Sequence, residues 1–283
     1  MATIKELQDA TEESTSKYIE AGGIRIHYNE IGTGDPILCL HGGGPGATGW
    51  SNFKQNIQDI ASNNRVLMMD MPGWGKSEYP ETDGDWFDFI GKVIEDFLDA
   101  VGVNQVDLIG NSMGGQAGLG FALRCPSRLK HLVLIGSQPT EAGIVIQPTP
   151  QEALANIGAY YGGDGPSIEK MERLVRSLVY DSSFITPETL RERYESSITP
   201  VNLERGKRGL PKRRDLYSEL STIEVSTLIV WGQEDKGGAL EVGLQMLKLM
   251  KNARLYVFQR CGHWAQVEYR EEFDRIVLDF FNS

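Results

Sequence analysis

Cysteine is scarce in this sequence, and its few copies are dispersed. Cys39, Cys125 and Cys261 are the only three among 283 residues, and none belongs to a C-x-x-C pair. An odd and scattered set of thiols builds neither a disulfide framework nor a zinc site. We therefore expect reduced thiols in a cytoplasmic protein without a metal site.

Positive charge and long apolar runs are scarce as well. Lysine and arginine number 28 against 39 acidic residues, which gives a net charge of −11. A nucleic-acid partner needs a basic surface, so we expect none. No run approaches the ~18 apolar residues of a membrane span, and the charged N-terminal segment, with Lys5, Glu6 and Asp9, does not resemble a signal peptide. We expect no membrane association.

The pentapeptide GNSMG at 110–114 is the most informative feature that the sequence does contain. It follows an apolar run, 106–109, that predicts a buried strand, and it precedes a stretch, 116–123, that predicts a helix. A G-x-S-x-G motif between a strand and a helix is typical of a nucleophile elbow. The glycines leave room in a strained turn, and Ser112 would present its hydroxyl at the positive end of the helix.

Short apolar runs alternate with amphipathic stretches along most of the chain. One stretch, 87–101, places Phe87, Ile90 and Ile94 on one helical face. This alternation predicts an α/β fold with a mostly parallel central sheet flanked by helices. The predicted strands are 18–20, 24–31, 37–40, 65–70, 106–110, 129–135, 227–231 and 255–258, of which the first two form a hairpin. Ligands of such sheets bind beyond the carboxyl ends of the strands.

One interval, 138–220, breaks this alternation. It is helical in pattern and contains no convincing strand. We interpret it as a helical lid inserted before the last two strands. The predicted domains are therefore a core, 1–137 with 221–283, and the lid, 138–220.

A base and a carboxylate for the serine follow by elimination. Of the four histidines, His27 and His131 lie within predicted strands, where structural roles are expected, and a third opens a glycine loop. The fourth, His263, follows the last predicted strand and is the candidate base. Asp235 follows the strand before it and is favoured over Glu234 as the carboxylate that orients the imidazole. The order serine, aspartate, histidine is that of the α/β-hydrolase fold.

The glycine loop that begins at His41 follows the strand 37–40. Its backbone N–H groups would approach a substrate oxygen and form an oxyanion hole. We assign this hole to the amides of Gly42, Gly43 and Met113. The same loop fits G-x-G-x-x-G literally at 44–49, but Pro45 removes a donor from the turn, which disfavours a dinucleotide site.

Together these segments resemble one family. The segments HGGGPGA at 41–47, WSNF at 50–53, GNSMGG at 110–115, WG at 231–232 with Asp235, and CGHWAQ at 261–266 are similar to the meta-cleavage product hydrolases. These are carbon–carbon bond hydrolases of the α/β-hydrolase superfamily, and the resemblance covers nearly the whole chain. It implies cleavage of a vinylogous 1,5-diketone of the 2-hydroxy-6-oxohexa-2,4-dienoate type to a 2-hydroxydienoate and a carboxylic acid, in aromatic or steroid ring catabolism. It also implies a homodimer or homotetramer that uses neither a metal nor a cofactor.

The resemblance further implies how an anionic dienoate is held. Arg193 matches the family's lid arginine, and it lies at the edge of an apolar stripe in a helix predicted to start near Pro187. Asn52 and Asn111 match positions that contact the dienoate, and Trp264 matches a residue beside the catalytic histidine.

Some positions depart from the family or admit other interpretations. Val267 and the segment 237–239 replace bulkier family residues, so the group beyond the scissile bond stays open. The basic run 205–214 is expected to coat a solvated lid loop. Two alternative functions remain: a carboxylesterase with the same fold, and a non-catalytic receptor, which the complete set of serine, aspartate and histidine disfavours.

Overall fold

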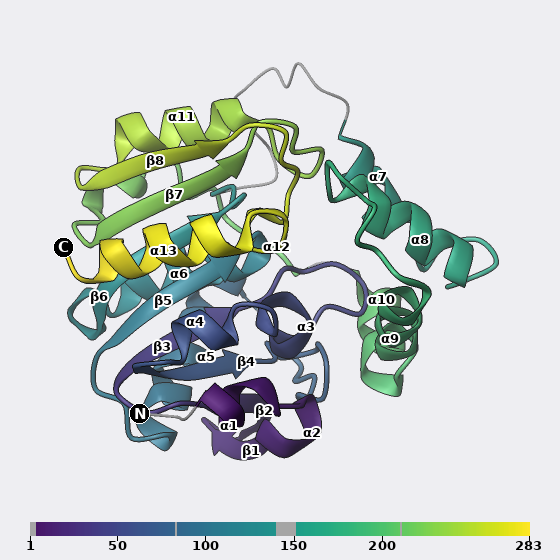
Figure 1. Cartoon of the computed structure of the whole chain (residues 1–283), viewed down its shortest axis with the longest axis horizontal. Coiled ribbons are helices and arrows are strands. Elements are labelled where there is room, and N and C mark those ends of the chain that lie inside the picture. Colours follow the sequence, from purple (N-terminus) through teal and green to yellow (C-terminus); the bar gives the residue numbers. More distant parts are fainter. Residues whose placement is uncertain (1–3, 83, 140–150, 210) are drawn as a thin grey trace.

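The computed structural model describes residues 4–82, 84–139, 151–209 and 211–283, and all structural statements concern these ranges. Its centre is one sheet of eight strands in the order β1-β2-β4-β3-β5-β6-β7-β8 (Figure 1). All eight predicted strands are present, with ends within two residues of the prediction. Their bounds are β1 Ser16–Ala21, β2 Ile24–Ile31, β3 Asp35–Leu40, β4 Asn64–Met69, β5 Val106–Asn111, β6 Leu129–Ile135, β7 Ser226–Gly232 and β8 Ala253–Phe258.

The sheet is mostly parallel, as predicted. β2 pairs antiparallel with both β1 and β4, whereas every pair from β4 through β8 is parallel. Alternate residues of a strand point to opposite faces. In β3, Leu38 and Leu40 join one apolar core, and Ile37 and Cys39 join the other. The sheet is therefore covered on both sides, which explains its continuous apolar strands.

Two sets of helices cover the two faces. The helices α5 (Trp86–Ala100), α6 (Met113–Arg124) and α11 (Leu240–Leu249) bury their apolar stripes in the first core. The opposite core takes side chains from α1 (Ile4–Gln8), α3 (Gly49–Phe53), α4 (Ile57–Ile60), α12 (Ala265–Glu268) and α13 (Arg270–Phe281). Three short elements lie between the others: α2 (Glu12–Thr15), η1 (Pro126–Arg128) and η2 (Leu220–Thr222). Asp85 caps α5 by accepting a hydrogen bond from the Phe87 amide at 3.0 Å, an interaction typically worth ~1 kcal/mol.

Within the described ranges, four α-helices follow β6 and precede β7 in the chain. They are α7 (Glu152–Ala159), α8 (Ile168–Ser177), α9 (Pro187–Ser197) and α10 (Pro200–Arg208), and within the described ranges this interval contains no strand. α9 begins where predicted, since the side chain of Thr186 accepts from the Thr189 amide and Pro187 occupies the first turn. Side chains of α7, α8 and α9 share a small core of their own, to which Trp264 contributes.

Contacts place these helices at the carboxyl ends of the parallel strands. Lys236, after β7, pairs with Glu152 of α7 at 3.0 Å. The His263 amide, after β8, donates to the Leu178 carbonyl at the end of α8 at 2.7 Å. Figure 1 shows α7 to α10 together on one side of the sheet. They therefore stand over the edge at which ligands of such sheets bind. None of the helices in the described ranges has the length and apolar character that crossing a bilayer requires.

Candidate active site

Ser112 occupies a strained turn between β5 and α6. Its φ of 53° and ψ of −116° lie in a region that L-residues rarely adopt. A Cβ at Gly110 would lie 2.4 Å from the Gly115 nitrogen, and one at Gly114 would lie 2.1 Å from the Leu40 carbonyl oxygen. Only glycine fits at both positions, which is the physical reason for the G-x-S-x-G pattern. The turn leaves Ser112 at the N-terminus of α6.

His263 and Asp235 form a buried pair. The imidazole Nδ1 lies 2.7 Å from Asp235 Oδ2, and the two residues are 5% and 3% exposed. The second carboxylate oxygen, Oδ1, accepts hydrogen bonds from the Gly237 and Gly238 amides at 2.6 and 3.0 Å. Glu234, the alternative carboxylate, is exposed to solvent. Asp235 is therefore the acidic residue that contacts the imidazole.

The electrostatics of this pair suit a base. Burial lowers the pKa of His263, but the charge of Asp235 and its hydrogen bond raise it, and the net pKa lies above the ordinary value. The imidazolium that forms when the base accepts a proton is thereby stabilised.

Two glycines hold the imidazole next to the pocket that contains Ser112. A Cβ at Gly136, whose φ is +54°, would lie 2.8 Å from His263 Nδ1 and 3.0 Å from Asp235 Oδ2. A Cβ at Gly237 would lie 3.0 Å from the same Nδ1. Both glycines line one pocket with Ser112. Among the described residues no hydrogen bond joins Ser112 Oγ to the imidazole, so the structure places the imidazole against two glycines that line the Ser112 pocket, without that link.

In the glycine loop after β3, one of the predicted oxyanion donors already donates to another acceptor. The Gly42 amide donates to Asn52 Oδ1 at 2.9 Å, because α3 folds back and brings Asn52 against the loop. Gly42 is therefore not available to a substrate oxygen, contrary to the prediction. The amides of Gly43 and Met113 donate to no acceptor in the described part of the chain, and a Cβ at Gly43 would lie 2.7 Å from Met113 Sδ. These two amides remain the candidates.

His41 fixes the conformation of this loop. Its Nδ1 donates to the Gly42 carbonyl at 2.8 Å, and its Nε2 accepts from the Met71 amide at 3.0 Å. Burial lowers the pKa of His41 to about 4. The ring is therefore neutral at pH 7, which the donation and acceptance of these two bonds require. The Trp74 indole donates to the Gly43 carbonyl at 3.2 Å and holds the next residue.

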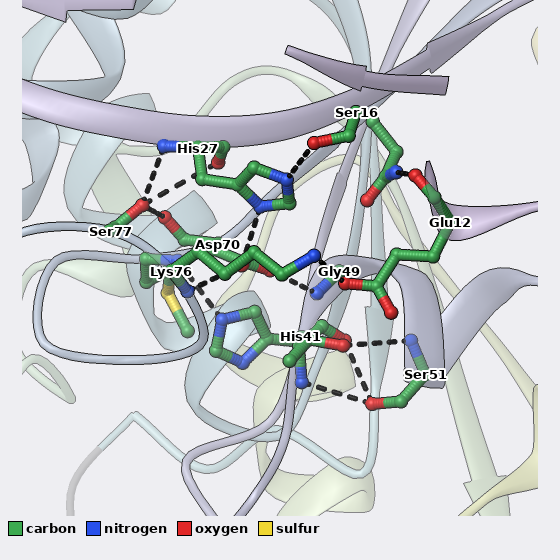
Figure 2. A network of polar contacts seen from close by, with 12 residues as sticks. Glu12, Ser16, His27, His41, Gly49, Ser51, Asp70, Lys76 and Ser77 are labelled. Carbon is green, nitrogen blue, oxygen red and sulfur yellow. Dashed lines mark hydrogen bonds and ion pairs between the residues drawn. The ribbon is translucent and has the colours of Figure 1, made fainter. Parts of the chain in front are cut away.

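The other two histidines have the structural surroundings predicted for them. His27 is buried with its Nδ1 2.7 Å from Asp70 Oδ2 (Figure 2). The other oxygen of Asp70 accepts from the Gly49 amide at 2.8 Å, so this pair ties the N-terminal hairpin to the end of the glycine loop. His131, on β6, contacts Asp107 at 2.9 Å.

Arg193 of α9 is a buried cation beside the glycine loop. It is 8% exposed, and its guanidinium lies 5.1 Å from the centroid of the Trp264 ring. A Cβ at Gly44 would lie 3.1 Å from its Nη2, and Gly44 lines the Ser112 pocket. Its Nε has no partner, and no carboxylate in the described ranges pairs with it. Burial lowers the pKa of Arg193 to about 10, so it stays charged at pH 7. A buried charge of this kind favours an anionic ligand.

Asn111, the residue before Ser112, has one free polar atom. Its Nδ2 donates to the Ile135 and His263 carbonyls, each at 3.3 Å. Its Oδ1 is buried without a partner, and a Cβ at Gly42 would lie 3.1 Å from it. The atom that Asn111 offers to a ligand is therefore an acceptor, which suits a hydroxyl group rather than a carboxylate.

The expectation of a solvated basic run at 205–214 is wrong for two of its arginines. Arg205 is 5% exposed, with its guanidinium 4.4 Å from the Trp74 ring centroid and its Nη2 3.3 Å from the Tyr161 hydroxyl. Arg213 lines the pocket that contains Ser112. α10 ends at Arg208, so no helical periodicity in the sequence indicates which later side chains point inward.

Metal-ligand clusters are absent from the described ranges, where no group of three or more His, Cys, Asp or Glu side chains is placed to hold an ion.

Comparison with known proteins agrees with this geometry. The sequence profile of the Alpha/beta hydrolase family matches residues 37–276. A 2-hydroxy-6-oxononadienedioate/2-hydroxy-6-oxononatrienedioate hydrolase of Burkholderia vietnamiensis is 39% identical over 95% of this chain and 96% of its own length.

Two solved structures have the same fold. The meta-cleavage product hydrolase CumD from Pseudomonas fluorescens, a mutant form complexed with acetates, superposes with a TM-score of 0.83, with 33% identity over 94% of this chain and 97% of that one. The 2-hydroxy-6-oxo-6-phenylhexa-2,4-dienoate hydrolase of a Rhodococcus species superposes with a TM-score of 0.80, with 27% identity over 95% and 98%. The chain therefore belongs to the meta-cleavage product hydrolases of the alpha/beta hydrolase family.

Proposed function

We propose that this protein hydrolyses the carbon–carbon bond of a 2-hydroxy-6-oxohexa-2,4-dienoate, releasing a 2-hydroxydienoate and a carboxylic acid. The observation that carries the proposal is Arg193, a buried guanidinium with no carboxylate partner in the described ranges, beside the loop that lines the Ser112 pocket. A neutral ester would leave this charge uncompensated, whereas the carboxylate of a dienoate would pair with it.

The proposed reaction has two stages. In the first, the enolate takes up a proton at C5 and becomes a ketone, with His263 and Asp235 as the proton-transferring pair. In the second, Ser112 or a water activated by His263 attacks the C6 carbonyl, and the amides of Gly43 and Met113 stabilise the oxyanion. The bond between C5 and C6 then breaks, its electron pair passes into the dienolate, and a proton taken up at the C2 oxygen gives the 2-hydroxydienoate. If Ser112 is the nucleophile, water hydrolyses the acyl enzyme.

The remaining contacts of the proposed site follow from the same geometry. Trp264 orients Arg193 by stacking at 5.1 Å, and Asn52 holds the glycine loop through its 2.9 Å bond to the Gly42 amide. Before the substrate ionises to the enolate, its 2-hydroxyl would donate a hydrogen bond to the unpartnered Oδ1 of Asn111.

The division into a core, 1–137 with 221–283, and a lid, 138–220, is part of this proposal. Its support is the separate apolar cluster of α7 to α9 and their position over the strand ends. We also propose a cytoplasmic homodimer or homotetramer. Light scattering after size-exclusion chromatography tests the oligomer, since an elution as a 31.4 kDa species would contradict it.

The deciding assay is the loss of visible absorbance of a yellow dienoate. We expect kcat/KM for a dienoate to exceed that for simple esters. Much faster turnover of esters would instead identify a carboxylesterase with the same fold. A non-catalytic receptor would turn over neither class and would keep its function after Ser112→Ala.

Names of relatives leave the acyl group open. The Burkholderia relative is named for dioates, which carry a carboxylate at each end, whereas the Rhodococcus structure is named for a phenyl substrate. The choice between a carboxylate-bearing and a phenyl-bearing acyl group has to be argued from the residues that line the pocket of this chain.

A further inference from the structure

Two side chains hold the peptide groups on either side of Gly43. His41 Nδ1 donates to the Gly42 carbonyl, which belongs to the peptide group that carries the Gly43 N–H. The Trp74 indole donates to the Gly43 carbonyl, in the next peptide group, at 3.2 Å. Glycine has the widest range of backbone conformations, and three glycines occur here in a row. The direction of the candidate oxyanion donor therefore depends on these two bonds.

Trp74 lies in a turn of defined shape after β4. Its amide donates to the Met71 carbonyl at 2.9 Å, and its carbonyl accepts from the Ser77 amide at 3.1 Å. Gly73 and Gly75 flank it with positive φ values of 85° and 54°. Because β3 and β4 are parallel neighbours, this turn and the glycine loop lie at the same edge of the sheet. The indole N–H therefore reaches the glycine loop from a fixed position.

An arginine of α10 covers the Trp74 ring. The Arg205 guanidinium carbon lies 4.4 Å from the ring centroid, and the residue is 5% exposed. Its Nη2 donates to the Tyr161 hydroxyl at 3.3 Å, its Nε has no partner, and no carboxylate in the described ranges pairs with it. A buried cation needs compensation, and tryptophan is the aromatic residue that best provides it. The position of α10 is therefore tied to the indole of Trp74.

Tyr161 extends this link to α9. Its hydroxyl donates to the Ser197 carbonyl at 3.0 Å, at the end of the helix that carries Arg193. Its ring packs on Gly206 of α10, where a Cβ would lie 2.6 Å from the ring. α9, α10 and Tyr161 thus form one contact network that meets the core at Trp74.

We infer that Trp74 is a positioning residue for the Gly43 oxyanion donor and that Arg205 couples Trp74 to the helices over the site. The inference rests on the proposed function, in which the Gly43 amide stabilises the oxyanion. The helices that bring Arg193 to the substrate carboxylate would then also keep the oxyanion donor in place. Neither Trp74 nor Arg205 touches the substrate in this role.

Trp74→Phe tests the positioning role, because it removes the indole N–H and keeps an aromatic face for Arg205. We expect kcat to fall about 10-fold for a dienoate and for a simple ester alike, the range of one neutral hydrogen bond. KM should stay within about 2-fold, since the oxyanion exists only after attack. Losing an oxyanion donor outright would cost more, about 10²- to 10³-fold. An unchanged kcat would overturn the positioning role.

Arg205→Met tests the coupling, because it keeps the aliphatic stem and removes the charge. It should lower kcat about 3- to 10-fold on both substrate classes, as the loss of one cation–π contact allows. Arg205→Lys, which keeps a cation, should recover part of this loss. Lys207→Gln, exposed on the same helix, is the matched control for loss of one charge. A rise in KM for dienoates alone in Arg205→Met would overturn the coupling, because it would assign the guanidinium to the substrate carboxylate.

A double variant decides whether the two residues act through the same bond. If Arg205 acts through the bond from Trp74 to Gly43, Trp74→Phe combined with Arg205→Met should lose about as much kcat as Trp74→Phe alone. Additive losses would overturn the coupling. Urea unfolding of each variant gives the folded fraction by which kcat is corrected, so a loss of stability alone leaves the corrected kcat unchanged.

The ester assay separates this inference from the proposed function. If the wild type cleaves esters and no dienoate, the proposed function fails, and the same variants assayed on the ester still test Trp74 and Arg205. If it cleaves dienoates and Trp74→Phe retains full kcat, the inference fails and the proposed function stands. A chain that cleaves neither class would remove both.

Discussion

In the described ranges, two histidine–aspartate pairs have both residues buried, and their contact distances are equal. The imidazole Nδ1 lies 2.7 Å from a carboxylate oxygen in both His263–Asp235 and His27–Asp70. The second pair even has a serine in contact, because Ser16 Oγ lies 2.8 Å from His27 Nε2 (Figure 2). By distance alone, Ser16, His27 and Asp70 form a more complete triad than Ser112, His263 and Asp235.

The surroundings separate the two sets. Ser16 lies in an ordinary extended strand, and His27 is fully buried. Ser112 instead occupies a strained turn at a helix N-terminus, next to two amides that donate to no acceptor in the described ranges and a pocket that the glycines around His263 also line. Contact among a serine, a histidine and an aspartate therefore does not identify a hydrolase site. The elbow, the amide donors and the pocket do.

The largest expected difference between the two sets comes from their serines. Ser112→Ala should lower kcat for a dienoate by at least about 10³-fold, because the nucleophile or the activated water loses its partner. Ser16→Ala should leave kcat within about 2-fold, since a substitution far from the reacting groups acts mainly on stability. Steady-state kinetics on both variants checks the comparison, and comparable losses would show that the distinction is false.

The two aspartates should differ in the quantity that they change. Asp235→Asn should lower kcat by about 10³- to 10⁴-fold, because the imidazole loses the partner that fixes its tautomer. Asp70→Asn should lower the free energy of unfolding by about 3 kcal/mol, because a buried pair is broken, and should change kcat far less. Urea unfolding and kinetics of both variants give the two numbers. A larger kcat loss in Asp70→Asn would reverse the assignment.

Arg193 offers a smaller contrast within one helix. Arg193→Gln should lower kcat/KM for dienoates by about 10- to 100-fold and spare neutral esters, because only the dienoate carries the carboxylate. Arg191→Gln, exposed on the same helix, should change neither. Equal losses on dienoates and esters would remove the proposed role of Arg193 in anion binding.

The smallest effect is a pH dependence that distinguishes activity from stability. A base must be neutral, and the pKa of His263 is raised above its ordinary 6.5. Activity on a non-ionisable ester should therefore fall as the pH decreases through a value above 6.5. The stabilisation from protonated His263 has the opposite sign: it is complete below the unfolded pKa and is lost as the pH rises through the folded one. An acid limb well below 6.5 would contradict the raised pKa.

Local patterns were sufficient to predict the sheet and the order of its strands in the chain. The two-residue period of a strand and the 3.6-residue period of a helix involve residues that are close together in the sequence. Both can therefore be recognised without knowing the fold. The elbow at Ser112 and the acidic residue after β7 were predictable for the same reason, since each follows directly on an apolar strand.

Contacts between distant segments were not predictable from local patterns. The Asn52 side chain determines which amide of the glycine loop is free. The helix that carries Asn52 folds back against the loop, and the Oδ1 of Asn52 accepts the hydrogen bond of the Gly42 amide. The burial of Arg205 and the inward position of Arg213 depend on Trp74 and Trp86, which lie far from both arginines in the sequence. No charge pattern within the basic run contains that information.

Gly136 has a consequence for mutational tolerance. It carries no functional group, yet any side chain there would overlap the imidazole of His263 and the carboxylate of Asp235, and its positive φ disfavours every other residue. In a saturation library selected for growth on the substrate, position 136 should be depleted of all variants as thoroughly as the triad itself. A screen that reads only abundance of folded protein should find the position more permissive.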